Sequence, residues 1–151
     1  MQSFGLLRKD VERTVYRGET ISRLLRPTSG EVMLMTYNFP ETAWDEDSPL
    51  GKKLMEWYGN GIRIRVVGGP SINAKEYVSE LVKIQVIDVR ILPKPQTRHV
   101  CIATNPQQLF IEKKHTIGLA KNCYYTDKPY PEVYGKFIGF FEKLWEEGLE
   151  I

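Results

Sequence analysis

Residues 98–115 have the sequence RHVCIATNPQQLFIEKKH and predict a β-hairpin. An alternating apolar run at 100–104 meets a second run at 109–111 across a polar turn that contains Asn105-Pro106, a typical turn dipeptide. The two histidines of the chain, His99 and His115, stand near the two ends of this stretch. Histidine is the side chain whose ordinary pKa lies nearest neutral pH, so this hairpin is the first place to look for chemistry.

Around the hairpin, the sequence alternates between strand and helix patterns. We expect strands at 11–17, 31–39, 62–67 and 85–92, helices at 19–27, 49–58, 73–82 and 133–145, and a loop at 121–131. Alternating strands and helices indicate parallel crossovers, and a closing hairpin adds antiparallel strands. The sequence therefore predicts an α/β fold, with a mixed, mainly parallel sheet flanked by helices, in one domain over residues 1–151.

The composition is that of an ordinary globular protein. The chain has 151 residues, of which 42% are hydrophobic and 26% charged, and its net charge of +2 permits a nucleic-acid partner without requiring one. No apolar run approaches the roughly 20 residues that a membrane span needs, and Arg8, Lys9 and Asp10 interrupt any signal-peptide core. We expect a cytoplasmic protein with no membrane segment.

The cysteines and histidines do not have the spacing of a metal site. Cys101 and Cys123 form no CxxC pair, and the two histidines lie far apart in the sequence, so we expect neither a metal nor another cofactor. We expect reduced thiols; a Cys101–Cys123 bridge is the less favoured alternative.

The order of elements and several local motifs resemble one half of a phospholipase D superfamily unit, over about residues 15–148. The motifs are TYNF at 36–39, GNGIRIRVV at 59–67, a strand-initial His99 after a proline-rich approach, and aromatic residues in the last helix. The family signature is H-x-K-x-x-x-x-D, followed by Gly-Ser and an Asn. The resemblance implies a histidine that attacks phosphorus, a lysine that holds the phosphate oxygens, and a second histidine from a symmetry-related half.

This chain departs from that signature. His99 fills the histidine position, but Cys101 stands where the lysine should be and Pro106 where the aspartate should be. Gly118 and Asn122 match the later glycine and asparagine only with an insertion. A thiol is mostly uncharged near neutral pH, and the loss of one such electrostatic contact typically costs about 10²–10³ in rate. The resemblance therefore implies a degenerate member, similar to the sensor domains of archaeal TrmB-like transcription regulators.

The resemblance implies a catalytically impaired or inactive module that binds an anionic or phosphate-bearing ligand, or a protein partner, in a regulatory role. Because the family joins two halves, it also implies a homodimer whose two His99 sites meet near the axis. The alternative is a metal-independent phosphodiesterase or nuclease that acts as a homodimer through a catalytic His99.

Candidate ligand-binding residues lie in the hairpin and beyond the carboxyl ends of the predicted strands. They are Asn38, Gly68, Gly69, Arg98, His99, Lys113, Lys114 and His115.

Each candidate also has a structural alternative. His99 could be a buried, hydrogen-bonded strand residue, the charges at 113–115 a solvated turn, and the glycine pair a tight turn. Arg63 and Arg65 lie on one side of a predicted internal strand, so they need either acidic partners or an anion.

Overall fold

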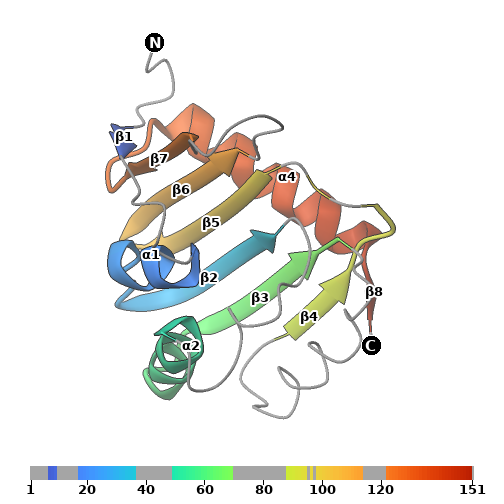
Figure 1. The fold of residues 1–151 in the computed structure, drawn as a ribbon, viewed down its shortest axis with the longest axis horizontal. Coiled ribbons are helices and arrows are strands. Elements are labelled where there is room, and N and C mark those ends of the chain that lie inside the picture. The colour runs from blue at the N-terminus through green and yellow to red at the C-terminus, as the bar shows by residue number, and fades with distance from the viewer. Residues whose placement is uncertain are drawn as a thin grey trace.

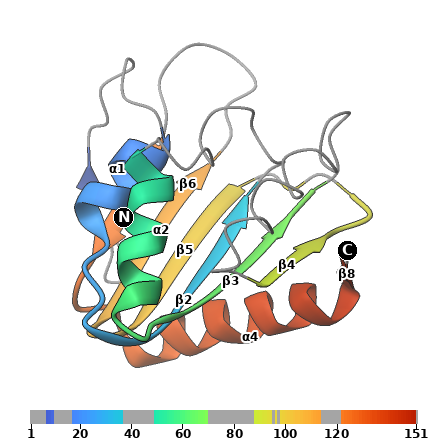
Figure 2. The same cartoon turned by 90° about the horizontal axis from the view of Figure 1, so that it is seen from below.

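The computed structural model describes residues 7–9, 17–36, 49–69, 88–94, 96, 98–113 and 122–150. These residues form one eight-stranded sheet in the order β1-β7-β6-β5-β2-β3-β4-β8. Helices α1 and α2 cover one face of the sheet, and α4 lies across the other (Figures 1 and 2). The strands are β1 (Leu7–Lys9), β2 (Ser29–Thr36), β3 (Arg63–Gly68), β4 (Asp88–Ile91), β5 (Arg98–Asn105), β6 (Gln107–Lys113), β7 (Asn122–Thr126) and β8 (Leu149–Glu150); the helices are α1 (Arg17–Leu24), α2 (Pro49–Gly59) and α4 (Pro131–Glu147).

The predicted mixed sheet with flanking helices is confirmed, but the expectation of a mainly parallel sheet was wrong. Only β2–β3 and β3–β4 pair in parallel, whereas five pairs are antiparallel: β1–β7, β2–β5, β4–β8, β5–β6 and β6–β7. Three of these pairs join β2, β5, β6 and β7, which are neighbours in the sheet, and the short strands β1 and β8 add one antiparallel pair at each edge.

Two local expectations also need correction. Residues 122–126, within the expected loop, form β7, since Tyr124, Tyr125 and Thr126 favour strands. Arg17, expected at the end of a strand, is the first residue of α1. The rest of that strand and the helix at 73–82 lie outside the described residues.

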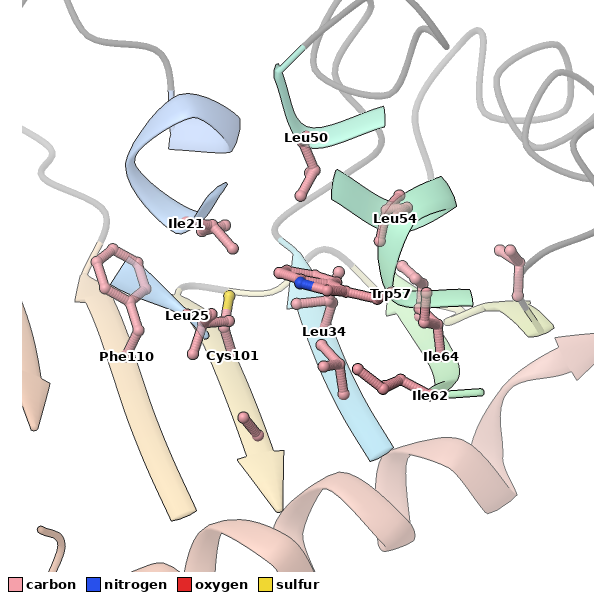
Figure 3. Close-up of a cluster of buried hydrophobic side chains, with 14 residues drawn as sticks. Ile21, Leu25, Leu34, Leu50, Leu54, Trp57, Ile62, Ile64, Cys101 and Phe110 are labelled. Atoms are coloured by element: carbon pink, nitrogen blue, oxygen red, sulfur yellow. The ribbon is translucent and has the colours of Figure 1, made fainter. Parts of the chain in front are cut away.

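Side-chain alternation divides the core into two clusters. On the α1 and α2 face, Ile21, Leu50 and Trp57 belong to one cluster with Leu34 and Phe110 (Figure 3). On the opposite face, α4 packs on the odd-numbered residues of β2 and β3 and on even-numbered residues of β5. The second cluster, on this face, includes Met33, Met35, Val67, Val100, Ile102, Phe141 and Leu144.

The helix boundaries follow the predicted signals. Pro49 begins α2, and the turn after Gly59 includes Gly61, whose φ of 79° favours glycine. The predicted stop at Gly148 is confirmed; a Cβ atom there would lie 2.7 Å from Cβ of Arg90, so glycine permits this close approach. Within the described part of the chain, no helix has the length and apolarity to cross a membrane.

Candidate functional site

His99 lies at the carboxyl edge of the parallel strands. The last residues of β2 and β3, Thr36 and Gly68, are register partners. Strand β5 runs antiparallel to β2 and begins at the same edge, where Val100 pairs with Met35. Ligand sites of open α/β sheets are found beyond such an edge.

Three buried polar side chains stand side by side at this edge, and we name Thr36, His99 and Glu112 the polar row. Glu112 is the register partner of His99, and Thr36 follows the residue that pairs with Val100. Their exposed fractions are 2%, 3% and 2%. All three continue the alternation that points toward α1 and α2, so the row forms one polar strip on that face.

The next row of the same face is apolar. Cys101, where the resemblance implies a lysine, is 1% exposed and belongs to the cluster that contains Ile21, Leu25 and Phe110 (Figure 3). Its register partner is Phe110. Cys101 therefore lies in the core beneath α1.

The register rules out a Cys101–Cys123 bridge. Cys123 pairs with Glu112 on β6, so two inter-strand spacings and one row separate it from Cys101. With strands about 4.8 Å apart, the Cα atoms are about 10 Å or more apart, beyond the roughly 7 Å limit of a disulfide. Cys101 is not part of a disulfide bond. The described segments contain no group of three or more His, Cys, Asp or Glu side chains that could hold a metal ion.

The structure separates Arg98 from His99. Consecutive residues of a strand face opposite sides, and the guanidinium carbon of Arg98 lies 5.8 Å from the ring centroid of Phe140 on α4. Gly68 and Gly69 are buried beside the polar row, and the Gly68 carbonyl accepts a hydrogen bond of 2.7 Å from the Leu92 amide. Lys113 pairs through its backbone with Arg98. Asn38, Lys114 and His115 lie outside the described residues.

Arg63 and Arg65 have acidic partners. Arg65 donates to Glu31 through Nε (2.7 Å) and Nη2 (2.9 Å), and also to Glu142 through Nη1 and Nη2. Its guanidinium carbon lies 5.2 Å from the ring centroids of both Phe141 and Trp145. Arg63, which is mostly exposed, pairs with Glu31 and Asp88. Pairing with acidic side chains, rather than with a bound anion, therefore accounts for both arginines.

The ion-pair network changes the pKa of two of its members. Burial alone would lower the pKa of Arg65, but the hydrogen bonds and charges of Glu31 and Glu142 outweigh it and raise that pKa. The hydrogen bond from Arg65 lowers the pKa of Glu142 more than burial raises it. The network fixes α4 to the sheet on the face opposite His99.

Glu112 and Thr36 are not among the residues that the sequence predicts for this edge. Glu112 stands directly before two lysines, so the local sequence resembles a solvated charge run. The available signal was strand alternation: Phe110 and Glu112 share a face, and so do Leu34 and Thr36. Only the pairing of β6 on both sides shows that Glu112 is buried.

Two comparisons with solved structures identify the fold. The chain matches Nuc from Salmonella typhimurium, a phospholipase D family member, with a TM-score of 0.71 and 13% identity over 99% of each chain. It also matches TrmBL2, an archaeal chromatin protein, with a TM-score of 0.64 and 12% identity over 98% of this chain. This match covers 54% of the TrmBL2 chain, so our chain spans about half of that protein.

No family model matches the sequence, and no curated protein matches it. At these identities the structural matches show the fold alone. That fold is phospholipase D-like, which confirms the predicted resemblance.

Proposed function

We propose that this chain is a catalytically impaired phospholipase D-like module that acts by binding a ligand or protein partner in a regulatory role. One observation carries the proposal: Cys101 lies in the apolar core, at the position where the resemblance implies lysine. A neutral thiol cannot neutralise the charge that develops on a phosphoryl group. Neither the thiol nor its apolar neighbours can replace the missing ammonium.

The proposed ligand is anionic or phosphate-bearing and contacts the carboxyl edge of β2 and β3. Gly68 and Gly69 carry no side chain that would keep a phosphate from the backbone at the end of β3, and His99 lies two strands away, on the far side of β2. Asn38, Lys113, Lys114 and His115 remain proposed contributors. Arg98 has the least support, because its guanidinium lies against α4.

We further propose that the module is a cytoplasmic homodimer. The homodimer follows from the resemblance, in which two halves complete one site. TrmBL2 is described as binding DNA in a novel mode, so nucleic acid is a partner worth testing here.

The alternative, a phosphodiesterase that uses His99, is favoured by Glu112. A carboxylate beside an imidazole is the arrangement that orients and activates a histidine in many catalytic sites. Glu112 is the register partner of His99, so it is the carboxylate available for that role, whereas the position at which the resemblance implies lysine supplies no ammonium.

A thermal-shift experiment tests the binding proposal. The probes are inorganic phosphate, AMP and a single-stranded oligonucleotide, measured on wild-type protein, on His99→Ala, and on the exposed turn variant Gln107→Ala as a control. We expect at least one probe to raise the Tm of the wild type and of Gln107→Ala but not that of His99→Ala. Equal shifts in all three proteins, or no shift in any of them, would contradict an anion site at His99.

A further inference from the structure

The outer side of α4 carries six exposed residues that share one face of the helix. Figure 2 shows α4 along one side of the sheet, with no described helix or strand beyond it. Residues at positions i, i+3, i+4, i+7, i+8 and i+11 of a helix lie on one face. We name the residues at these positions the outer face of α4, and all of them are exposed: Glu132, Gly135, Lys136, Gly139, Phe140 and Lys143.

The fold of the single chain does not require the two glycines of this face. Apart from the backbone of α4 itself, no heavy atom of the described residues lies within 4 Å of a Cβ atom built at Gly135 or Gly139. Neither glycine has a positive φ. Because glycine inside a helix destabilises it relative to alanine, two such residues in the middle of α4 favour a close approach from outside the chain.

The remaining residues of the outer face supply an aromatic ring and charges of both signs. Phe140 is 38% exposed, although the guanidinium carbon of Arg98 lies 5.8 Å from its ring centroid. Within the described part of the chain, the ion pairs do not include Glu132, Lys136 or Lys143. These charges are therefore available to a partner from outside.

We propose that the outer face of α4 binds the same face of a second copy of this chain, with the two helices antiparallel. In such a pair, each step toward the C-terminus of one helix is a step toward the N-terminus of the other. When Phe140 lies opposite the partner's Gly135, the ring packs where no side chain obstructs it, and Lys136 lies opposite the partner's Gly139. The pair is two-fold symmetric, so each contact occurs twice.

The charges favour this arrangement over its alternatives. In the same register, Lys143 lies opposite the partner's Glu132, which gives two contacts between opposite charges. A parallel pair would put each charged residue opposite itself. An antiparallel pair shifted by one turn would put Lys136 opposite the partner's Lys143. Like charges in an interface oppose binding, so the charge pattern supports a second copy in the first register.

This surface is not the one that the resemblance implies for the homodimer. There the two His99 sites meet at the carboxyl edge, whereas here α4 meets α4, so the inference goes beyond the proposed function. The helix has 17 residues and is about 25 Å long, so the contact lies at the small end of specific interfaces. We expect a dimer that dissociates on dilution.

Sedimentation velocity at a series of protein concentrations tests the two glycines. We expect the double variant Gly135→Ala/Gly139→Ala to weaken the dimer at least about tenfold, because methyl groups keep the helices apart. The same variant should raise the Tm of the dilute, monomeric protein, because alanine favours the helix. Gly59→Ala is the matched control, since Gly59 ends α2 and also has open space at its Cβ position; it should leave association unchanged.

Charge reversal tests the register. Lys143→Glu places like charges at both symmetric contacts and should weaken the dimer at least about tenfold. Glu132→Lys combined with Lys143→Glu restores opposite charges and should return the dissociation constant to within about threefold of the wild-type value.

A wild type that stays monomeric at every concentration would overturn the proposal. So would a dimer that the glycine and Lys143→Glu variants leave unchanged, but that result would not contradict the dimer that the resemblance implies. Loss of the phosphate thermal shift in His99→Ala does not depend on α4, so the two proposals fail separately.

Discussion

His99 and Cys101 lie two residues apart on the same face of β5, yet they occupy different surroundings. His99 stands in the polar row beside Glu112, whereas Cys101 belongs to the apolar cluster with Ile21 of α1. The boundary between the polar edge and the core therefore falls between these two positions. The apolar cluster beneath α1 encloses Cys101, the position at which the resemblance implies a lysine.

Placing a lysine at position 101, as the resemblance implies, should destabilise the protein. We expect Cys101→Lys to lower the free energy of unfolding by about 3 kcal/mol or more, because an unpaired ammonium would be buried among apolar side chains. Urea unfolding measures the loss, and Cys101→Val, which keeps the site apolar, should cost less than about 1.5 kcal/mol. A Cys101→Lys variant as stable as the wild type would show that this position is open to solvent.

The bond between Arg65 and Glu142 makes stability depend on pH. The lowered pKa of Glu142 in the folded protein means that its contribution is complete above the unfolded value of 4.5 and declines as the pH falls through the lower folded pKa. The difference in unfolding free energy between the wild type and Glu142→Gln should therefore be largest above about pH 5 and shrink toward pH 3. Glu147→Gln, an exposed change in the same helix, should follow the wild-type profile; a difference independent of pH for Glu142→Gln would contradict the ion pair.

Gln108 joins the end of α1 to the sheet. Its Oε1 accepts a hydrogen bond from the Arg26 amide (2.8 Å), and its Nε2 donates to the Leu24 carbonyl (3.1 Å) and to the Tyr125 hydroxyl. Gln108→Ala leaves these groups without their partner and should cost about 2 kcal/mol. The neighbouring Gln107 is exposed, so Gln107→Ala should change stability by less than about 0.5 kcal/mol. Equal losses in the two variants would mean that these hydrogen bonds contribute little.

Two glycines with positive φ give a matched pair of variants. Gly30 has φ of 81° and a Cβ atom there would collide with Oγ1 of Thr104, whereas Gly61 has φ of 79° and no atom within 4 Å of that position. Alanine at Gly61 should cost about 1–2 kcal/mol from the backbone conformation alone. Gly30→Ala should cost more, and thermal unfolding of the two variants measures the difference. A smaller loss for Gly30→Ala would contradict the close approach of β2 and β5.

Sequence patterns predicted those elements whose signals are local. Pro49 and Gly59 mark α2, the aromatic stripe marks α4, and alternation marks the β5–β6 hairpin. The order of strands in space is not a local property, so the placement of β5 beside β2 and the resulting excess of antiparallel pairs were missed. The short strand β7 was missed because Asp127 and the following proline gave residues 121–131 the composition of a loop.

The site was predicted in part for the same reasons. The position of His99 near the start of β5 was predicted, because a strand-initial position follows from local pattern and resemblance. Arg98 was grouped with it by adjacency, although alternation sends the two side chains to opposite faces. The burial of Glu112 depends on strands that pair on both sides of β6, which no local window contains.

Hydrolysis of a phosphodiester tests the central claim most directly. Wild-type protein and His99→Ala are each incubated with bis(p-nitrophenyl) phosphate and with single-stranded DNA, in the presence of a chelator. We expect no turnover by the wild type above that of His99→Ala, because the buried thiol of Cys101 cannot replace the lysine. Turnover by the wild type that disappears in His99→Ala would contradict the proposal of an impaired module and establish the phosphodiesterase alternative.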